Sequence, residues 1–287
     1  MNITDAKRGF LFCEGQPDSL DFALLNRLAL PAGVMLIPLR GKGSAERFIE
    51  GYFAGYGDGR PRPPHLLFRD RDFDFRPSER IELLKPNANK PIYLSYRSCI
   101  ENYLLDATLL DEFWQYGFDK QWQFGPSPGN EELEKWILEA ARAITEYQAT
   151  RWALSSLAPE EGWSGLANRW MRDMPLVLDE PECLRQARKL ITIWNNKIEF
   201  VIQEQFETCY HDWLGKFRQC GFWDKREYQI YFSGKEMAVM MERNSPYTPC
   251  FPLSSFFKWA VEKLNWASHA DLLGLQNKLS ELRVKTP

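Results

Sequence analysis

The chain has 287 residues, of which 44% are hydrophobic, enough for one large domain or two of ordinary size. No apolar run approaches the roughly 20 residues that span a bilayer, and the first residues lack the hydrophobic segment of a signal peptide. The net charge of −3 argues against a nonspecific nucleic-acid coat but is compatible with a local basic groove. Six cysteines without a CxxC pair favour reduced thiols in a cytoplasmic protein.

Short apolar runs alternate with helical patterns over the first part of the chain. The runs predict strands at residues 9–13, 34–38, 66–69 and 92–95. The segments between them predict helices at 18–28, with Asp18 or a neighbour as N-cap, and at 45–56. This alternation is typical of an α/β fold with a parallel sheet and helices on its faces.

The rest of the chain is expected to be mainly helical. A loop at 124–130 precedes a helix at 131–150, a break follows at 159–165, and 181–220 is one long helix or a broken pair. A late strand is predicted at 228–232, then helices at 236–243, 254–264 and 269–283. We therefore expect a core at 1–112, a helical domain or insertion at 113–227, and a C-terminal part at 228–287. If the late strand returned to the sheet, Lys235 would lie at the edge that carries the acids.

Acidic residues follow two of the predicted strands. Glu14 comes after the first strand, and Asp70 and Asp72 come after the third. Ligands gather at the carboxyl ends of parallel strands, and Asp70 and Asp72 would point the same way if their strand continued. Clustered carboxylates suit a hard cation such as Mg²⁺ or Mn²⁺. The alternative interpretation is a solvated acidic turn.

These residues carry a resemblance. Glu14-Gly15, the Gly41-Lys42 turn and Asp70-x-Asp72 resemble a Toprim domain, the α/β catalytic core of topoisomerases, bacterial primases and OLD-family nucleases. More narrowly, Phe-Cys-Glu-Gly, Arg-Gly-Lys-Gly, Arg-Asp-Arg-Asp-Phe, Ser-Cys-Ile-Glu-Asn-Tyr-Leu-Leu and Ser-Gly-Lys-Glu resemble the AriB family, the effectors of the PARIS anti-phage defence system. The motifs cover roughly the first 110 residues, and Ser233-Gly234-Lys235 is the one later match.

The resemblance implies a Mg²⁺- or Mn²⁺-dependent endonuclease with Glu14, Asp70 and Asp72 as metal ligands. Further catalytic roles are not fixed by the motif: Glu101 is the favoured extra acid, while Lys42, Arg97 and Lys235 compete for the basic role. Nucleic-acid binding is expected from Arg40, Lys42 and Arg97. An ordinary surface turn is the alternative for Lys42, and a first-turn helical Glu is the alternative for Glu101.

The resemblance also implies partners. An ABC-type ATPase, AriA, would hold the effector until a phage protein triggers its release, and the freed toxin would dimerise and cleave host tRNA. Aromatic residues are enriched at interfaces, so a Trp-rich segment could supply the dimer or ATPase contact, with ordinary helical core as the alternative; its members are Trp114, Trp122, Trp136, Trp152, Trp163 and Trp170. Competing functions are a non-catalytic Toprim-like module docked on an ATPase, a DNA-directed OLD-type nuclease, and a primase or topoisomerase core.

Overall fold

The computed structural model describes residues 9–39, 45–55, 62–120, 125–157, 174–195 and 203–282. These residues fall into two compact units. The sheet unit comprises residues within 1–70, 78–96 and 254–287, and the helical unit comprises those within 71–77 and 97–253. The C-terminal helices therefore belong with the N-terminal strands, and the acidic segment after the third strand crosses from one unit to the other.

The sheet unit is built on four parallel strands in the order β2-β1-β3-β4. Their bounds are β1 Phe10–Cys13, β2 Met35–Pro38, β3 His65–Arg69 and β4 Ile92–Leu94. Each lies on a predicted strand, so the α/β prediction is confirmed. β1 is buried along its whole length, as expected for a central strand covered on both faces.

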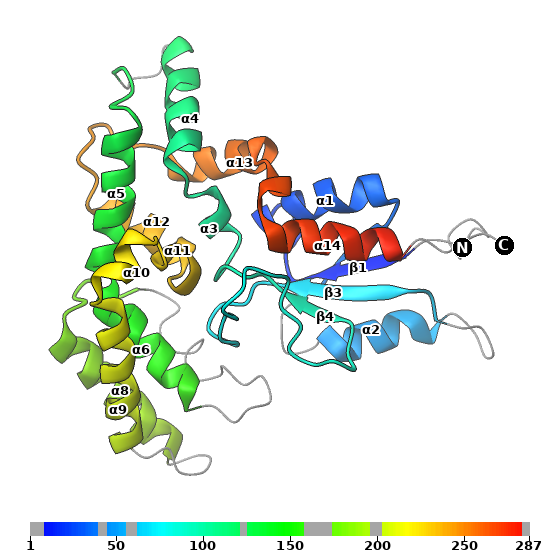
Figure 1. The fold of residues 1–287 in the computed structure, drawn as a ribbon, viewed down its shortest axis with the longest axis horizontal. Helices are drawn as coiled ribbons and strands as arrows, with labels where there is room; N and C mark the ends of the chain where they lie inside the picture. Colours follow the sequence, from blue (N-terminus) through cyan, green and yellow to red (C-terminus); the bar gives the residue numbers. More distant parts are fainter. Residues whose placement is uncertain are drawn as a thin grey trace. The chain divides into compact units, whose positions relative to one another are not determined.

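Helices cover both faces of this sheet (Figure 1). α2 (Ala45–Ala54) lies on one face, where Phe10 and Phe12 pack with Ile49 and Phe53 in the core. α1 (Leu20–Ala32) and α14 (Ala270–Glu281) lie side by side on the other face. Two further elements, α13 (Leu253–Lys263) and the short η3 (Trp266–Ser268), come before α14 in the chain. The N-cap of α1 is Ser19, whose hydroxyl accepts a hydrogen bond from the Phe22 N–H at 3.2 Å.

The helical unit is organised around α6 (Thr145–Ser156), in which residues 147–154 are all buried. α8 and α9 pack beside it (Figure 1). The other helices are α3 Glu101–Leu104, α4 Ala107–Asp119, α5 Asn130–Ala143, α8 Glu180–Asn195, α9 Gln203–Phe217, α10 Cys220–Asp224, α11 Tyr228–Tyr231 and α12 Gly234–Arg243. α6 is buried without being apolar: its buried residues include the polar Thr145, Gln148, Thr150 and Arg151, which therefore need hydrogen-bond partners inside the unit.

The helix boundaries of this unit differ in part from the predicted ones. The helix expected at 131–150 is two helices, α5 and α6, that meet at Ile144. The segment 181–220 holds the pair α8 and α9, with 196–202 outside the described residues. The break expected at 159–165 also lies outside the described residues.

The strand predicted at 228–232 is wrong. Tyr228–Tyr231 form the short helix α11, closed by a hydrogen bond from the Phe232 N–H to the Tyr228 carbonyl at 2.9 Å. The apolar residues Tyr228 and Phe232 are spaced by four, which fits one face of a helix as well as one face of a strand. The sheet formed by the described residues has four strands, so the idea that this segment returns to it is wrong as well.

Tryptophans fill the core of the helical unit. Trp114, Trp136 and Trp152 are buried, with Trp114 stacked on Phe251 at 4.6 Å between ring centroids and Trp152 stacked on Trp213 at 4.7 Å. These three fit the helical-core alternative for the Trp-rich segment. Trp122, Trp163 and Trp170 lie outside the described residues.

The six cysteines all lie within the described residues and form no disulfide there. Among the residues that the structure describes, no helix has the length and apolar character that crossing a membrane requires.

Candidate functional site

Two of the predicted acidic residues leave the sheet at the same edge. Glu14 directly follows β1 and Asp70 directly follows β3, and these strands are parallel neighbours with Cys13 paired to Phe68. Adjacent strands lie about 4.8 Å apart, so the two acids emerge close together. Asp70 is buried and Glu14 half-buried, and one carboxylate oxygen of each, Asp70 Oδ1 and Glu14 Oε1, is shielded from solvent.

The glycine after Glu14 has a steric reason. A Cβ atom at Gly15 would lie 2.2 Å from the Ser19 hydroxyl oxygen and 2.9 Å from the Asp21 Cβ. The end of β1 therefore passes directly against the start of α1, and only glycine fits there. Gly15 thus allows the chain to turn against α1 directly after Glu14, which keeps Glu14 at the end of the strand.

The edge has a negative electrostatic character. The Cys13 thiol, next to Glu14 in the chain, has its pKa raised to about 12, first by burial and then by the charges of Asp21 and Glu14. A thiol in this state is neutral and is not a nucleophile at neutral pH. The thiol is therefore not a candidate nucleophile at this position.

Asp72 lies in the helical unit, in a turn rather than a strand. β3 ends at Arg69, and Asp72 has a φ of +47°, in the left-handed region. Strand alternation therefore does not apply to Asp70 and Asp72, although two residues of chain keep their Cα atoms within about 7 Å. The Asp72 N–H donates to the Ser98 carbonyl at 2.7 Å, which fixes the turn on the segment preceding α3.

Arg71 holds this turn, and sequence reasoning missed it. Its side chain is fully buried and donates to the carbonyls of Phe75 at 2.8 Å and Asp72 at 3.2 Å, and to that of Ile230. The guanidinium lies 5.3 Å from the centre of the Trp152 ring. The only sequence indication of this role was the position of Arg71 between Asp70 and Asp72, where a positive charge can stabilise the turn.

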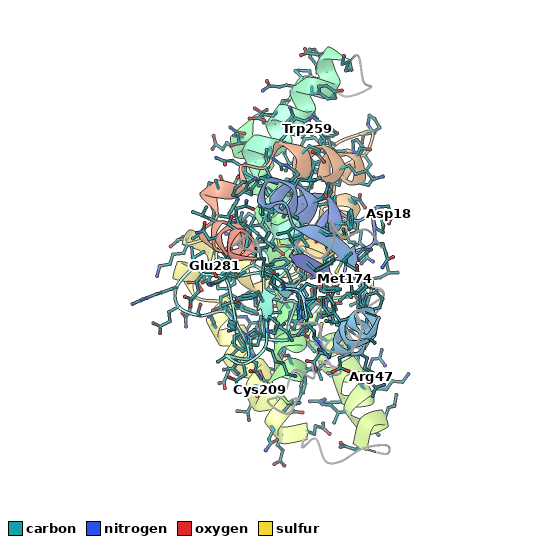
Figure 2. The ribbon with its side chains drawn as sticks, turned by 90° about the vertical axis from the view of Figure 1, so that its right-hand side faces the viewer. Asp18, Arg47, Met174, Cys209, Trp259 and Glu281 are labelled. Carbon is teal, nitrogen blue, oxygen red and sulfur yellow. The ribbon has the colours of Figure 1, made fainter. Side chains whose placement is uncertain are left out.

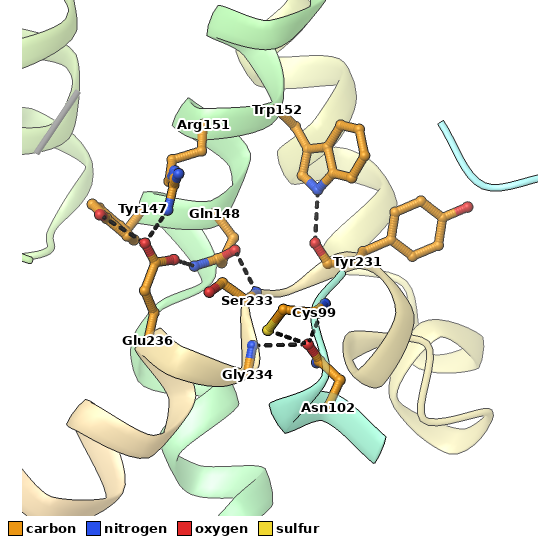
Figure 3. Close-up of polar contacts among 10 residues, drawn as sticks. All are labelled: Cys99, Asn102, Tyr147, Gln148, Arg151, Trp152, Tyr231, Ser233, Gly234 and Glu236. Carbon is orange, nitrogen blue, oxygen red and sulfur yellow. Dashed lines mark hydrogen bonds and ion pairs between the residues drawn. The ribbon is translucent and has the colours of Figure 1, made fainter. Parts of the chain in front are cut away.

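Two segments that carry motif residues come together at Asn102 (Figure 3). Its side-chain oxygen accepts hydrogen bonds from the backbone N–H groups of Cys99 at 3.1 Å and Gly234 at 2.9 Å. Its amide donates to the Phe232 carbonyl at 2.9 Å. The motif around residues 98–105 is therefore bound to the motif around residues 233–236.

This junction brings two of the predicted catalytic residues together. The ammonium nitrogen of Lys235, on the first turn of α12, lies 3.9 Å from Glu101 Oε2. The Lys235 side chain is 52% exposed and that of Glu101 is 11% exposed. An acid positioned beside a solvent-facing lysine can orient that lysine toward an anionic ligand.

Glu236, one residue further, lies at the centre of a buried network that sequence reasoning did not identify (Figure 3). Three side chains of α6 donate to its carboxylate: Arg151, Tyr147 at 3.2 Å and Gln148 at 2.5 Å. Burial lowers the pKa of Arg151, but the carboxylate of Glu236, with smaller contributions from other groups that include Asp72, outweighs burial and holds the pKa above its ordinary value. A cation beside the apolar residues Trp152, Ala153 and Leu154 of α6 was the sequence signal.

The remaining predicted residues are basic. Arg97 donates to the Asn102 carbonyl at 2.5 Å and lies over the Tyr103 ring at 5.1 Å from its centre, contacts that fix the start of α3. Arg40 and Lys42 lie outside the described residues.

The donor chemistry at the sheet edge fits Mg²⁺ or Mn²⁺. Within the described part of the chain, no group of three or more His, Cys, Asp or Glu side chains is arranged to hold a metal ion. Mg²⁺, however, is often held by only one or two carboxylates, with water and phosphate oxygens in its other positions. Glu14 and Asp70 supply two carboxylates at one edge, which meets that requirement.

No protein-family model matches the chain, and a search of curated proteins finds no match. The fold and the acids define a coarse class, an α/β protein with carboxylates at the carboxyl edge of a parallel sheet. Ligand binding at that edge is the general rule for open parallel sheets.

Proposed function

We propose that the chain is a metal-dependent endonuclease of Toprim type. The observation that carries the proposal is the position of Glu14 and Asp70, each directly after one of two adjacent parallel strands. A protein that only binds phosphate gains little from neighbouring carboxylates, because they repel the ligand. Carboxylates placed together are useful when a cation bridges them to a phosphate.

More narrowly, we propose an effector of the AriB type, a toxin of anti-phage defence that is released from an ABC-type ATPase like AriA and cleaves host tRNA. The contact of the 98–105 and 233–236 motifs at Asn102 supports this proposal, because the resemblance rests on both segments.

The proposed roles follow from chemistry at the sheet edge. Glu14, Asp70 and Asp72 hold Mg²⁺ or Mn²⁺, which when bound neutralises charge on the scissile phosphate and lowers the pKa of a coordinated water. By the resemblance, and not from a position at this edge, Lys235, which lies beside Glu101, donates to phosphate oxygens, with Lys42 as the competing candidate. Glu14 serves as general base if it does not bind metal.

The proposal is tested by a cleavage assay with the purified full chain. Total tRNA, plasmid DNA and single-stranded DNA are incubated with wild type in Mg²⁺, in Mn²⁺ and in chelator, beside Glu14→Gln and Asp70→Asn. Asp18→Asn is the matched control, because Asp18 is an exposed acid of the same unit that follows the same strand. We expect metal-dependent cutting of discrete tRNAs, reduced at least a hundredfold in both site variants and unchanged in the control.

Cutting that persists in Glu14→Gln and Asp70→Asn rules out the assigned site. Cutting of DNA alone retains the catalytic mechanism but replaces the tRNA effector with an OLD-type DNA nuclease. If wild type cuts nothing, with or without an added ATPase partner, and Mg²⁺ does not bind, the non-catalytic module is the better interpretation.

A further inference from the structure

A pocket of about 320 Å³ opens in the helical unit. Its walls come from the end of the 71–77 segment, from α9 and from α11. The lining includes Arg76, Asp212, Trp213, Lys216 and Tyr231. Cys209, labelled in Figure 2, also lines it from α9. The volume lies within the range of pockets that hold small molecules or single nucleotides.

Two cations of this pocket share one aromatic wall. The guanidinium carbon of Arg76 lies 5.3 Å from the centre of the Trp213 ring, and the Lys216 ammonium lies 5.6 Å from the same ring and 3.7 Å from the Tyr231 ring. Cation–π attraction of this kind draws both positive charges to one side of the pocket. An anionic group that enters meets both of them.

The wall is held in place by a chain of hydrogen bonds. The Ser156 hydroxyl oxygen accepts from Arg76 at 3.2 Å and from the Trp213 indole N–H at 3.1 Å. Trp152, stacked behind Trp213, donates to the Tyr231 carbonyl at 2.9 Å. The wall is therefore organised before any ligand binds, which reduces the entropic cost of binding.

The charges favour an anion, though not an arbitrary one. Asp212 also lines the pocket, and Lys216 lies 3.9 Å from Glu227, so the local positive charge is modest. A free inorganic ion gains little there. A ligand that combines a phosphate with a flat ring gains more, because its phosphate can take the cations off the rings and its base can then lie against Tyr231, which is half-buried and faces solvent in part.

The pocket also lies close along the chain to a proposed metal ligand. Arg76 follows Asp72 by four residues, a distance of at most about 14 Å even in a fully extended chain. We infer that this pocket binds one nucleotide of a single-stranded nucleic acid, whose phosphate draws Arg76 and Lys216 off the Trp213 and Tyr231 rings and whose base takes their place against those rings. The inference rests on the proposed function and adds a substrate class to it, a strand with an unpaired base.

The test measures binding in chelator, where no cutting occurs. Fluorescence anisotropy follows a short labelled single-stranded RNA, the DNA of the same sequence, and competition by free AMP. We expect Arg76→Gln and Lys216→Gln each to weaken strand binding about tenfold, the size of one charge-assisted hydrogen bond. The slope of log K against log salt should become shallower by about 0.7 for each phosphate that the variant no longer neutralises.

Three variants serve as controls. Arg185→Gln removes an exposed cation on α8 of the same unit and should leave binding unchanged. Arg76→Lys keeps the charge and should retain most of the affinity, which excludes loss of folding as the cause. Asp18→Asn, at an exposed acid outside the proposed metal site, should bind as wild type in chelator.

The outcomes separate this inference from the nuclease proposal. Strand binding that depends on Arg76 and Lys216 supports the pocket even if no cutting is found. If free AMP binds as tightly as the strand, and Arg76→Gln and Lys216→Gln weaken the binding of AMP as much as that of the strand, the ligand is the free nucleotide. That result would overturn the strand assignment. Binding that is absent for every probe, or that is unaffected by both variants while wild type still cuts, also overturns it.

Discussion

The backbone N–H of Gly234 donates to the side-chain oxygen of Asn102 at 2.9 Å, across 132 residues of sequence. Both residues are buried, and the same asparagine also binds the Phe232 carbonyl. One side chain thus satisfies backbone groups at the start of two helices, α3 and α12, and fixes the positions of Glu101 and Lys235 that flank it.

Gly234→Ala should destabilise the chain by about 1–3 kcal/mol, the usual cost of overpacking. A Cβ atom there would lie 2.6 Å from the Asn102 backbone nitrogen, and backbone atoms cannot give way cheaply. The urea midpoint measures the effect. Gly215→Ala, mid-helix in α9 with nothing within 4 Å of its Cβ position, is the control and should be neutral or stabilising. Equal behaviour of the two variants would contradict the packing at Asn102.

Glu236→Gln should cost about 3–5 kcal/mol, because it leaves the charge of Arg151 buried without its carboxylate. The side chains of the pair are 13% and 11% exposed. Glu182→Gln is a matched control: Glu182 also accepts from an arginine and a glutamine, Arg185 and Gln186, but the Arg185 side chain is 64% exposed, so its charge stays hydrated and the variant should move the denaturation midpoint much less.

Adding Arg151→Met to Glu236→Gln should restore part of the lost stability, because the unpaired charge is then absent. The pair would not be coupled in this way if the double variant lost more unfolding free energy than the two single variants lose when their losses are added.

Sequence patterns predicted the sheet because each strand is a short buried run whose identity depends on its own residues. Glu14 and Asp70 could be placed at one edge for the same reason, since parallel strands end together. The turn that carries Asp72 could not be predicted. It depends on Arg71, which bonds to the carbonyl of Ile230, 159 residues away.

The strand prediction for residues 228–232 was wrong for a related reason. Its apolar spacing suits a strand or a helix, and packing decided: Tyr228 and Phe232 are buried in the helical unit. The network at Glu236 was also beyond local patterns, because it depends on α6 lying against α12. Only the presence of the cation Arg151 next to Trp152, Ala153 and Leu154 hinted at a distant acid.

Stability should fall at high pH through two buried thiols. Burial, above all, raises the pKa of Cys13 and Cys183 from 9.0 to about 12. The folded chain therefore binds more protons than the unfolded chain between these values, so the thiols contribute stability that is fully present below pH 9.0 and is lost as pH rises toward about 12.

Urea midpoints measured against pH check this dependence. The decline above pH 9.0 should be shallower in Cys13→Ala/Cys183→Ala than in wild type, and slopes rather than absolute stabilities are compared because alanine also loses packing. Cys220→Ala removes an exposed thiol and should keep the wild-type slope. A double variant with the wild-type slope would assign the decline to other groups.

Mg²⁺ should raise the melting temperature of wild type by several degrees, because a ligand bound only by the folded state stabilises it, by about 2.7 kcal/mol at a hundredfold excess over Kd. Glu14→Gln and Asp70→Asn should abolish the shift, since each removes one of the two carboxylates at the sheet edge, whereas Asp18→Asn should keep it. Because this readout needs no substrate, it tests the metal site independently of cleavage. A shift of wild-type size in both site variants would place any bound Mg²⁺ elsewhere in the chain.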